Sequence, residues 1–195
     1  MSESGVVIGE DGPARCPWGL SAPEYVAYHD EEWGRPVHGD DALFERICLE
    51  AFQSGLSWLT ILRRRESFRT AFDGFKIDAV AAFTAADRER LLGDAGIIRN
   101  RAKIDASVLN AVAAREVRET YDGGLDGLIW SFAPDAATRP VPRALGDVPA
   151  TTPESTALAK DLKKRGFRFV GPTTAYALMQ ACGLVNDHLA DCTAR

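Results

Sequence analysis

The stretch that most constrains the fold runs from Lys160 to Cys192, where glycines separate two helical segments. A basic segment ends at Gly166, a short apolar turn follows, and Gly171 with the next residue, Pro172, opens a second segment. Glycine just after a helix and proline at a first helical position are the usual stop and start signals. The sequence therefore predicts two helices joined by a tight hairpin that is too short for strand pairing.

The start of the second helix is a candidate phosphate site. The first N–H groups of a helix have no partner within it and attract anions. Cations surround the hairpin, so a nucleic-acid phosphate is the expected anion. We predict DNA contacts at Lys163, Lys164, Arg165, Gly166, Gly171, Thr173 and Thr174, with Arg168 nearby. A second basic cluster, Arg63-Arg64-Arg65, is interpreted as a solvated helix face.

The rest of the chain has helical spacing almost throughout. Apolar residues recur at intervals of three to four in a segment that begins at Asp40 or Asp41, and further helices are expected to begin at Ser57, near Thr84 and at Thr152. Because no alternating pattern competes, the predicted fold class is all-α. We expect a flexible leader over residues 1–14 and a single helical domain over residues 15–195, with two lobes and a pocket between them.

Composition restricts the cellular setting. The 195 residues carry a net charge of −5, which excludes a polybasic coating protein but not a local DNA-binding patch. The sequence has neither an apolar run of about 18 residues nor the apolar centre of a signal peptide. We expect a cytoplasmic monomer without a membrane partner. In a reducing compartment, the four cysteines favour metal ligation over disulfides.

Two cysteines and two histidines form a candidate metal site. Cys16 and His29 lie near the beginning of the chain, and His188 and Cys192 lie one helical turn apart near the end. A Cys₂His₂ set suits tetrahedral zinc, and four protein ligands would make the site structural, clamping the two ends together. The alternative is a free thiol near a frayed terminus with ordinary surface histidines, because the spacing of the first pair is not that of a standard zinc finger.

Aromatic residues and one acidic residue form a second constellation. Glu50 lies in the apolar stretch 47–52. Four aromatic residues precede it in the sequence and one follows it: Trp18, Tyr25, Tyr28, Trp33 and Trp58. Core packing explains any one aromatic residue. As a group beside a carboxylate, they can line a pocket for a flat, electron-poor ring.

Together these residues resemble the 3-methyladenine DNA glycosylase I family, within the helix-hairpin-helix glycosylases. The resemblance covers about Arg15 to Cys192 in order. It rests on segments 16–18, 28–34, 47–58, 94–104, 129–132, 162–174 and 183–188. This chain departs from the family pattern at Pro17, where a glycine is familiar, and at Ala51 and Phe52, which could reshape the pocket wall.

The resemblance implies one structural zinc ion per chain, held by Cys16, His29, His188 and Cys192. It implies a base pocket built from Glu50, Tyr28 and Trp58, with Trp18, Tyr25 and Trp33 near it, and a turn at Leu56 that approaches the gap left by the extruded base. The implied reaction is hydrolysis of the N-glycosidic bond of 3-methyladenine in alkylated double-stranded DNA, with the free base as product. In that reaction Glu50 would favour the positive charge of the base.

The hairpin sequence also bears on the type of glycosylase. Relatives with lyase activity place a lysine after the second hairpin glycine, where this chain has Pro172, Thr173 and Thr174. The prediction is therefore a monofunctional enzyme that uses water. Asp187 is not assigned the role of supporting the sugar cation. Two other interpretations stay open: a non-catalytic DNA-binding hairpin module, which has no need of Glu50, and a zinc-structured interaction domain, which has no need of the basic hairpin.

Overall fold

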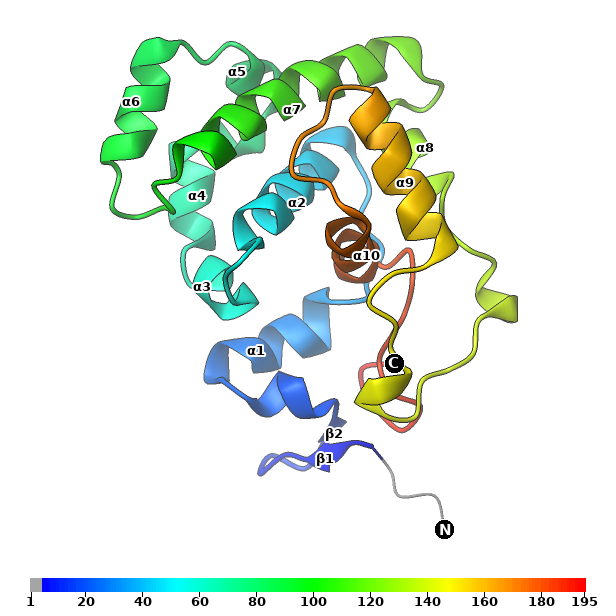
Figure 1. The fold of residues 1–195 in the computed structure, drawn as a ribbon. Coiled ribbons are helices and arrows are strands. Elements are labelled where there is room, and N and C mark those ends of the chain that lie inside the picture. Colours follow the sequence, from blue (N-terminus) through cyan, green and yellow to red (C-terminus); the bar gives the residue numbers. More distant parts are fainter. Residues whose placement is uncertain (1–4) are drawn as a thin grey trace.

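The computed structural model describes residues 5–195, and these are mostly helical (Figure 1). The α-helices are α1 (Pro23–Ala27), α2 (Asp40–Gln53), α3 (Trp58–Leu62), α4 (Arg65–Ala71), α5 (Ile77–Ala81), α6 (Ala85–Gly93), α7 (Arg101–Thr120), α8 (Gly124–Trp130), α9 (Pro153–Lys164) and α10 (Pro172–Ala181). Short 3₁₀ turns cover Pro17–Leu20, Asp73–Phe75, Ala136–Thr138 and Leu145–Asp147, and a π-helical turn covers Tyr28–Glu32. Within this part of the chain, no helix combines the length and the apolar character needed to cross a bilayer.

The helix boundaries follow local signals in the sequence. Ser57 caps α3 by accepting a hydrogen bond from the Thr60 N–H, and Thr84 caps α6 in a reciprocal capping box with Asp87. Thr152 caps α9 in the same way. The predicted helix end before Gly166 and the predicted start at Pro172 are both confirmed.

Helix α2 lies at the centre of the fold. Figure 1 shows it between α7, which runs above it, and α10, which is viewed along its axis. Its buried positions include Phe44 and Phe52, and Phe52 packs against Phe68 and Phe72 of the neighbouring α4 region. Because α2 is enclosed by other helices, a charged residue on its buried face is removed from water. The helix therefore carries Glu50 into the interior.

The connection between α9 and α10 is shaped by a buried amide on α7. Asn110 Oδ1 accepts a hydrogen bond from the Arg168 N–H at 2.7 Å, and Asn110 Nδ2 donates to the Arg168 carbonyl at 3.2 Å. Asn110 is fully buried. Gly166 and Phe169 have positive φ angles of 96° and 55°, which reverse the chain within a few residues. The hairpin is thus held from the side by α7.

Part of the N-terminal segment, for which the sequence predicted a flexible leader, forms paired strands. Of residues 1–14, the first four lie outside the described residues, and the following ones form a small antiparallel sheet from β1 (Val7–Ile8) and β2 (Ala14–Arg15). The buried Arg15 guanidinium holds this sheet in place by pairing with Asp11 at 2.7 Å and Asp30 at 2.8 Å. The predicted helical fold class is confirmed for the described residues, with these two strands of two residues each as the addition. The pairing spans too few residues to give an alternating pattern.

The sheet also meets the other end of the chain. Ala14 N–H donates to Thr193 Oγ1 at 3.0 Å, and the Thr193 N–H donates to the Ala14 carbonyl at 2.8 Å. Figure 1 shows the N- and C-terminal segments on the same side of the molecule. This arrangement brings residues near 16 and 29 close to residues near 188 and 192.

Candidate functional site

A cavity of about 340 Å³ opens between the N-terminal segment and helices α2, α3 and α10. Its size is within the range of small-molecule sites. The cavity is lined by Trp18, Ser21, Tyr25, Tyr28, Trp33, Glu50, Gln53, Trp58, Ala177 and Gln180. The structure therefore brings all six predicted pocket residues together, although four of them come from the N-terminal segment 18–33, one from α2 and one from α3.

The aromatic side chains of the pocket support one another. Trp18 contacts Tyr25 and Trp33 edge to face, with ring centroids 5.6 Å and 5.0 Å apart. Across the pocket, Tyr28 lies 5.4 Å from Trp58 in a tilted arrangement. Such pairs add stability beyond their buried area and limit ring rotation. The pocket walls are thus formed before any ligand enters.

Glu50 is the charged group of the pocket. Only 5% of the residue is exposed, so the carboxylate is turned inward and does not face solvent. No hydrogen-bond donor reaches its carboxylate among residues 5–195. Burial raises the pKa of Glu50 to about 8, and Arg46, one helical turn earlier, opposes this shift. A buried carboxylate without a partner is costly, which makes it a strong acceptor for a ligand that brings positive charge or N–H groups.

A second hollow continues from the same pocket. It shares Glu50, Gln53 and Ala177 with the first and is further lined by Ser54, Gly55, Leu56, Thr173 and Thr174. The turn at Leu56 and the first residues of α10 therefore border the opening that leads to Glu50. Leu56 is 42% exposed, and Gly55 has a positive φ of 79°, which presents the leucine outward.

The buried Lys103 stabilises the backbone just before the turn at Leu56. Its Nζ donates to the Phe52 carbonyl at 2.8 Å and to the Ser54 carbonyl at 2.6 Å, at the end of α2 where carbonyls lack helical partners. Burial lowers the pKa of Lys103. Sequence reasoning did not single out this lysine, because its two acceptors are backbone atoms about fifty residues away.

The predicted DNA-contact residues fall into two groups. Lys163 and Lys164 are exposed at the end of α9, and α10 begins without a side-chain cap on its first N–H groups. Arg165, in contrast, pairs with Asp161 at 2.6 Å and lies over the Tyr121 ring. The exposed lysines and the start of α10 therefore offer free charge and N–H groups, whereas Arg165 is already engaged.

The arginine triplet is also engaged within the fold. Arg63 pairs with Glu24, Arg65 with Glu32, and Arg64 donates to the Ala95 carbonyl. These contacts agree with the interpretation that the triplet is not a DNA-binding patch.

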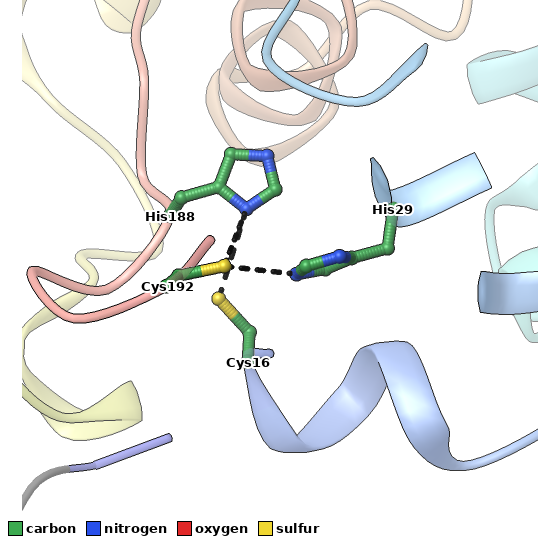
Figure 2. A group of neighbouring side chains, drawn as sticks. All are labelled: Cys16, His29, His188 and Cys192. Carbon is green, nitrogen blue, oxygen red and sulfur yellow. Dashed lines mark hydrogen bonds between the residues drawn. The ribbon is translucent and has the colours of Figure 1, made fainter. Parts of the chain in front are cut away.

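The four predicted metal ligands meet in one buried cluster (Figure 2). Cys192 Sγ lies 3.5 Å from both His29 Nε2 and His188 Nδ1, and Cys16 Sγ lies 3.8 Å from His188 Nδ1. A tetrahedral zinc ion with the usual bond lengths has sulfur–nitrogen edges of about 3.6 Å. The donor set and its spacing therefore fit a four-coordinate metal, and the predicted cluster is confirmed as a group that can bind one.

The surroundings of the two histidines fix the nitrogens that face the cluster. His29 Nδ1 lies 2.7 Å from Asp30, which is itself held by Arg15, so Nε2 is left for the metal. His188 Nε2 lies 3.0 Å from the Trp33 carbonyl, which leaves Nδ1. Burial lowers the pKa of His29 and lowers that of His188 to about 4, so both rings are neutral, as metal ligands must be.

Three polar pocket residues, Ser21, Gln53 and Gln180, were missed in the sequence, as was Ala177. Thr173, Ala177 and Gln180 follow at intervals of four and three residues, so they share one face of α10, and this spacing could have revealed Gln180. Asp187 lines neither hollow. It is buried behind α10 and accepts hydrogen bonds from Tyr176 and Gln180.

The fold is mostly helical, and its aromatic pocket surrounds a carboxylate without a hydrogen-bond partner among the described residues, which is the kind of site that suits one flat ring. The comparisons with known proteins show the family to which the chain belongs. The chain belongs to the methyladenine glycosylase family, whose model matches residues 18–195.

Individual relatives agree with this assignment. The chain is 48% identical over 178 residues to DNA-3-methyladenine glycosylase 1 of Escherichia coli (strain K12), covering 91% of this chain and 95% of that protein. A crystal structure of a 3-methyladenine DNA glycosylase I is 47% identical, with a TM-score of 0.85, over 92% of this chain and 98% of the other. The Staphylococcus aureus enzyme, solved to give the structural basis of its 3-methyladenine recognition, is 36% identical, with a TM-score of 0.85, over 92% and 95% of the two chains.

Proposed function

We propose that this protein is a DNA-repair glycosylase that hydrolyses the N-glycosidic bond of 3-methyladenine in alkylated double-stranded DNA. The observation that carries the proposal is the buried Glu50 carboxylate, which has no hydrogen-bond partner among the described residues and lies in an aromatic pocket. Membership of the methyladenine glycosylase family supports the same substrate. Because DNA is the substrate, the enzyme works in the compartment that holds the DNA, which we take to be the cytoplasm.

The chemistry begins with extrusion of the base, since the bond to the sugar is inaccessible while the base is stacked. Methylation at N3 gives adenine a delocalised positive charge and makes it a good leaving group. Tyr28 and Trp58, whose rings contact each other, together offer an aromatic surface on which the flat ring stacks, and such stacking contributes about 1–3 kcal/mol per base. Glu50 accepts hydrogen bonds from the amine edge of the base and favours its charge. The protein therefore contributes mainly by selecting and positioning the methylated base, because the methylation already activates the bond. Water then attacks the sugar and the base leaves.

The DNA duplex meets the same face of the molecule. Leu56 is exposed beside the pocket opening and fills the gap that the extruded base leaves. Thr173 and Thr174, at the uncapped start of α10, hold a phosphate through backbone N–H groups. Lys163 and Lys164 add charge next to them. Contacts of this kind hold the duplex without reading its sequence, so the pocket alone selects the damaged base.

The glycosylase is monofunctional in this proposal. The connection into α10 carries Pro172, Thr173 and Thr174, none of which has an amine to attack the sugar. The buried amine nearest the opening belongs to Lys103, and its hydrogen bonds to two carbonyls keep it in a structural role. The product is an abasic site with an intact strand, together with free 3-methyladenine.

One zinc ion per chain completes the proposal. Two neutral imidazoles and two cysteines fill the coordination of zinc, so the ion supplies folding energy and no open position for a substrate. Cys16 and His29 hold it from the N-terminal segment, and His188 and Cys192 hold it from the C-terminal segment. The protein acts as a monomer, because one chain contributes the whole pocket and the whole cluster.

The direct test is release of methylated base from alkylated DNA. We expect the purified protein to release free 3-methyladenine and to leave the strand unbroken, which chromatography of the bases and a gel of the DNA measure together. A non-catalytic hairpin module or a zinc-structured interaction domain would release no base. Strand cleavage at the abasic site would contradict the monofunctional assignment.

The hairpin makes a separate prediction. Replacing Lys163 and Lys164 by alanine removes two exposed cations, so affinity should fall to the same extent on duplexes of different sequence. The slope of log affinity against log salt should become shallower by about 2 phosphate equivalents or less. Titration of a labelled undamaged duplex at several salt concentrations measures both quantities. Arg63→Ala is the matched control, because this arginine is paired with Glu24. An unchanged slope in the double variant would move the DNA-binding face elsewhere.

A further inference from the structure

The carboxamide of Gln180 connects the base pocket to a buried polar cluster behind it. Gln180 lines the pocket together with Glu50. Its Nε2 donates a hydrogen bond to Asp187 Oδ2 at 2.9 Å. A carboxylate only accepts hydrogen bonds, so the nitrogen end of the amide must face Asp187. The carbonyl oxygen, Oε1, is then the end of the amide left for the pocket, and no donor reaches it among residues 5–195.

The orientation of the amide is fixed by contacts that hold Asp187 itself. Asp187 is buried, its Oδ2 also accepts from the Tyr176 hydroxyl at 2.5 Å, and its Oδ1 accepts from Arg139 Nη2 at 3.0 Å. Arg139 comes from the loop between α8 and α9, and Tyr176 lies one helical turn before Gln180. The charge of Arg139 stabilises the carboxylate as an acceptor. A rotation of the Gln180 amide by half a turn would bring two oxygens together and is therefore disfavoured.

The Gln180 carbonyl is thus an acceptor in the same pocket as the Glu50 carboxylate. We propose that Gln180, oriented by Asp187, is a specificity-determining residue that accepts a hydrogen bond from the exocyclic amine of an adenine and disfavours a purine with a carbonyl at that position. This inference rests on the proposed function. An amine on C6 carries two hydrogens and can serve both acceptors. A carbonyl on C6, as in guanine, places an oxygen against Oε1 with no hydrogen between them.

The expected discrimination is substantial because the pocket is buried. A site built to hydrogen-bond a ligand group rejects an analogue that lacks the group, since the polar atoms of the site are left without partners. We expect Gln180 to account for about a ten- to hundredfold difference in affinity between 3-methyladenine and 3-methylguanine. Gln180 is then a determinant of which alkylated purine is accepted, whereas Glu50 favours positive charge on either one.

Asp187→Asn tests the orientation directly. An asparagine at this position can donate to Gln180 Oε1, which would turn the amide and present Nε2 to the pocket. The ratio of the dissociation constants of the two free bases, 3-methyladenine and 3-methylguanine, is measured by quenching of tryptophan fluorescence. We expect 3-methyladenine to bind about ten- to hundredfold more weakly than in the parent and 3-methylguanine to bind more tightly. An unchanged ratio in a folded, metal-loaded variant overturns the inference.

Two further variants keep the test decisive. Tyr176→Phe removes a hydrogen bond to the same oxygen of Asp187 without changing the direction of the Gln180 amide, so the ratio should stay near that of the parent. If Tyr176→Phe changed the ratio of dissociation constants as much as Asp187→Asn does, the cause would be weaker anchoring of Asp187 and not the orientation of the Gln180 amide. Gln180→Met removes the acceptor altogether and should move the ratio of the two dissociation constants towards one. If Asp187→Asn does not fold, this variant alone tests whether Gln180 discriminates between the two bases. Base release from alkylated DNA by the parent protein tests the proposed function separately.

Discussion

His188→Ala is expected to lower the thermal stability and the metal content of the protein together. Metal binding energy becomes folding energy when the ligands come from distant parts of the chain, and here the two pairs are separated by about 160 residues. A ligand present at a thousand times its Kd stabilises the folded state by about 4 kcal/mol. For a protein of this size, that free energy corresponds to a fall in Tm of roughly 10 °C.

The measurement is a thermal melt combined with metal analysis of the pure protein. The parent should contain one zinc ion per chain, and a strong chelator should lower its Tm towards that of the variant. His38→Ala is a suitable control, because His38 is an exposed histidine that contacts Asp126 and lies outside the cluster. A parent protein without stoichiometric metal, or a His188→Ala variant that melts like the parent, would mean that the four ligands are not a metal clamp.

The cluster also adjoins the wall of the base pocket. The His188 ring lies 4.8 Å from Trp33 and bonds the Trp33 carbonyl, and Trp18 lies 5.0 Å from the His29 ring. Trp18 and Trp33, which line the pocket, therefore pack directly against the two predicted histidine ligands. Because a metal fixes the orientation of its histidines, its loss would remove support from this wall. Weaker base binding by the chelated protein should thus accompany its lower stability.

The features that could be predicted from the sequence are those with local signals or with rare residue types. Gly166 and Pro172 mark the helix ends around the hairpin, and the helices end and begin there. The metal cluster was predictable because the chain has few histidines and cysteines. The position of Glu50 was indicated by its apolar neighbours on one helix, since a carboxylate there is either solvent-facing or turned inward for binding.

The features that could not be predicted depend on contacts between distant segments. Asn110 grips the hairpin backbone, and Lys103 braces the turn at Leu56, but neither residue lies near its partner in the sequence. The order of residues 5–14 rests on Arg15 pairing with Asp30, which is likewise a tertiary contact. The orientation of the Gln180 amide depends on Asp187, whose own partners come from another loop. Periodicity and capping signals carry no information about such contacts.

Glu50→Gln should slow release of 3-methyladenine by about ten- to a hundredfold. The substitution keeps the shape of the side chain but removes the negative charge that favours a cationic base. A hydrogen bond to a charged group is worth about 1.5–3 kcal/mol, which sets the size of the effect. Affinity for undamaged duplex should be unchanged, because that binding depends on Leu56, the hairpin and the lysines beside it.

The raised pKa of Glu50 adds a pH dependence to this prediction. Its carboxyl titrates at about 8 in the free protein, against an ordinary value of 4.5. The ratio kcat/KM, which reports groups of the free enzyme, should therefore rise with pH and level off above about 8 as the carboxylate forms. The Glu50→Gln protein has no such group, so its kcat/KM should show no rise in this range.

The free energy of unfolding should fall as the pH rises, whereas kcat/KM rises. Between pH 4.5 and about 8 the unfolded chain has released the Glu50 proton while the folded protein still holds it, so stability falls as pH rises through this window. The loss is up to about 5 kcal/mol, at 1.36 kcal/mol for each pKa unit. Glu50→Gln removes this loss, and the variant should gain stability relative to the parent as the pH is raised from 5 to 9.

Two measurements on the same proteins separate the roles of this residue. Single-turnover release from a duplex with one 3-methyladenine gives the rate, and urea unfolding at pH 5 and pH 9 gives the stability. Glu119→Gln, on the exposed face of α7, is the control for removal of one carboxylate and should change neither. A Glu50→Gln protein that releases the base at the parent rate would leave recognition to the aromatic side chains alone. A slower variant that also gains stability at high pH would show that the fold gives up stability at Glu50 for the binding of a cationic base, as an active-site carboxylate requires.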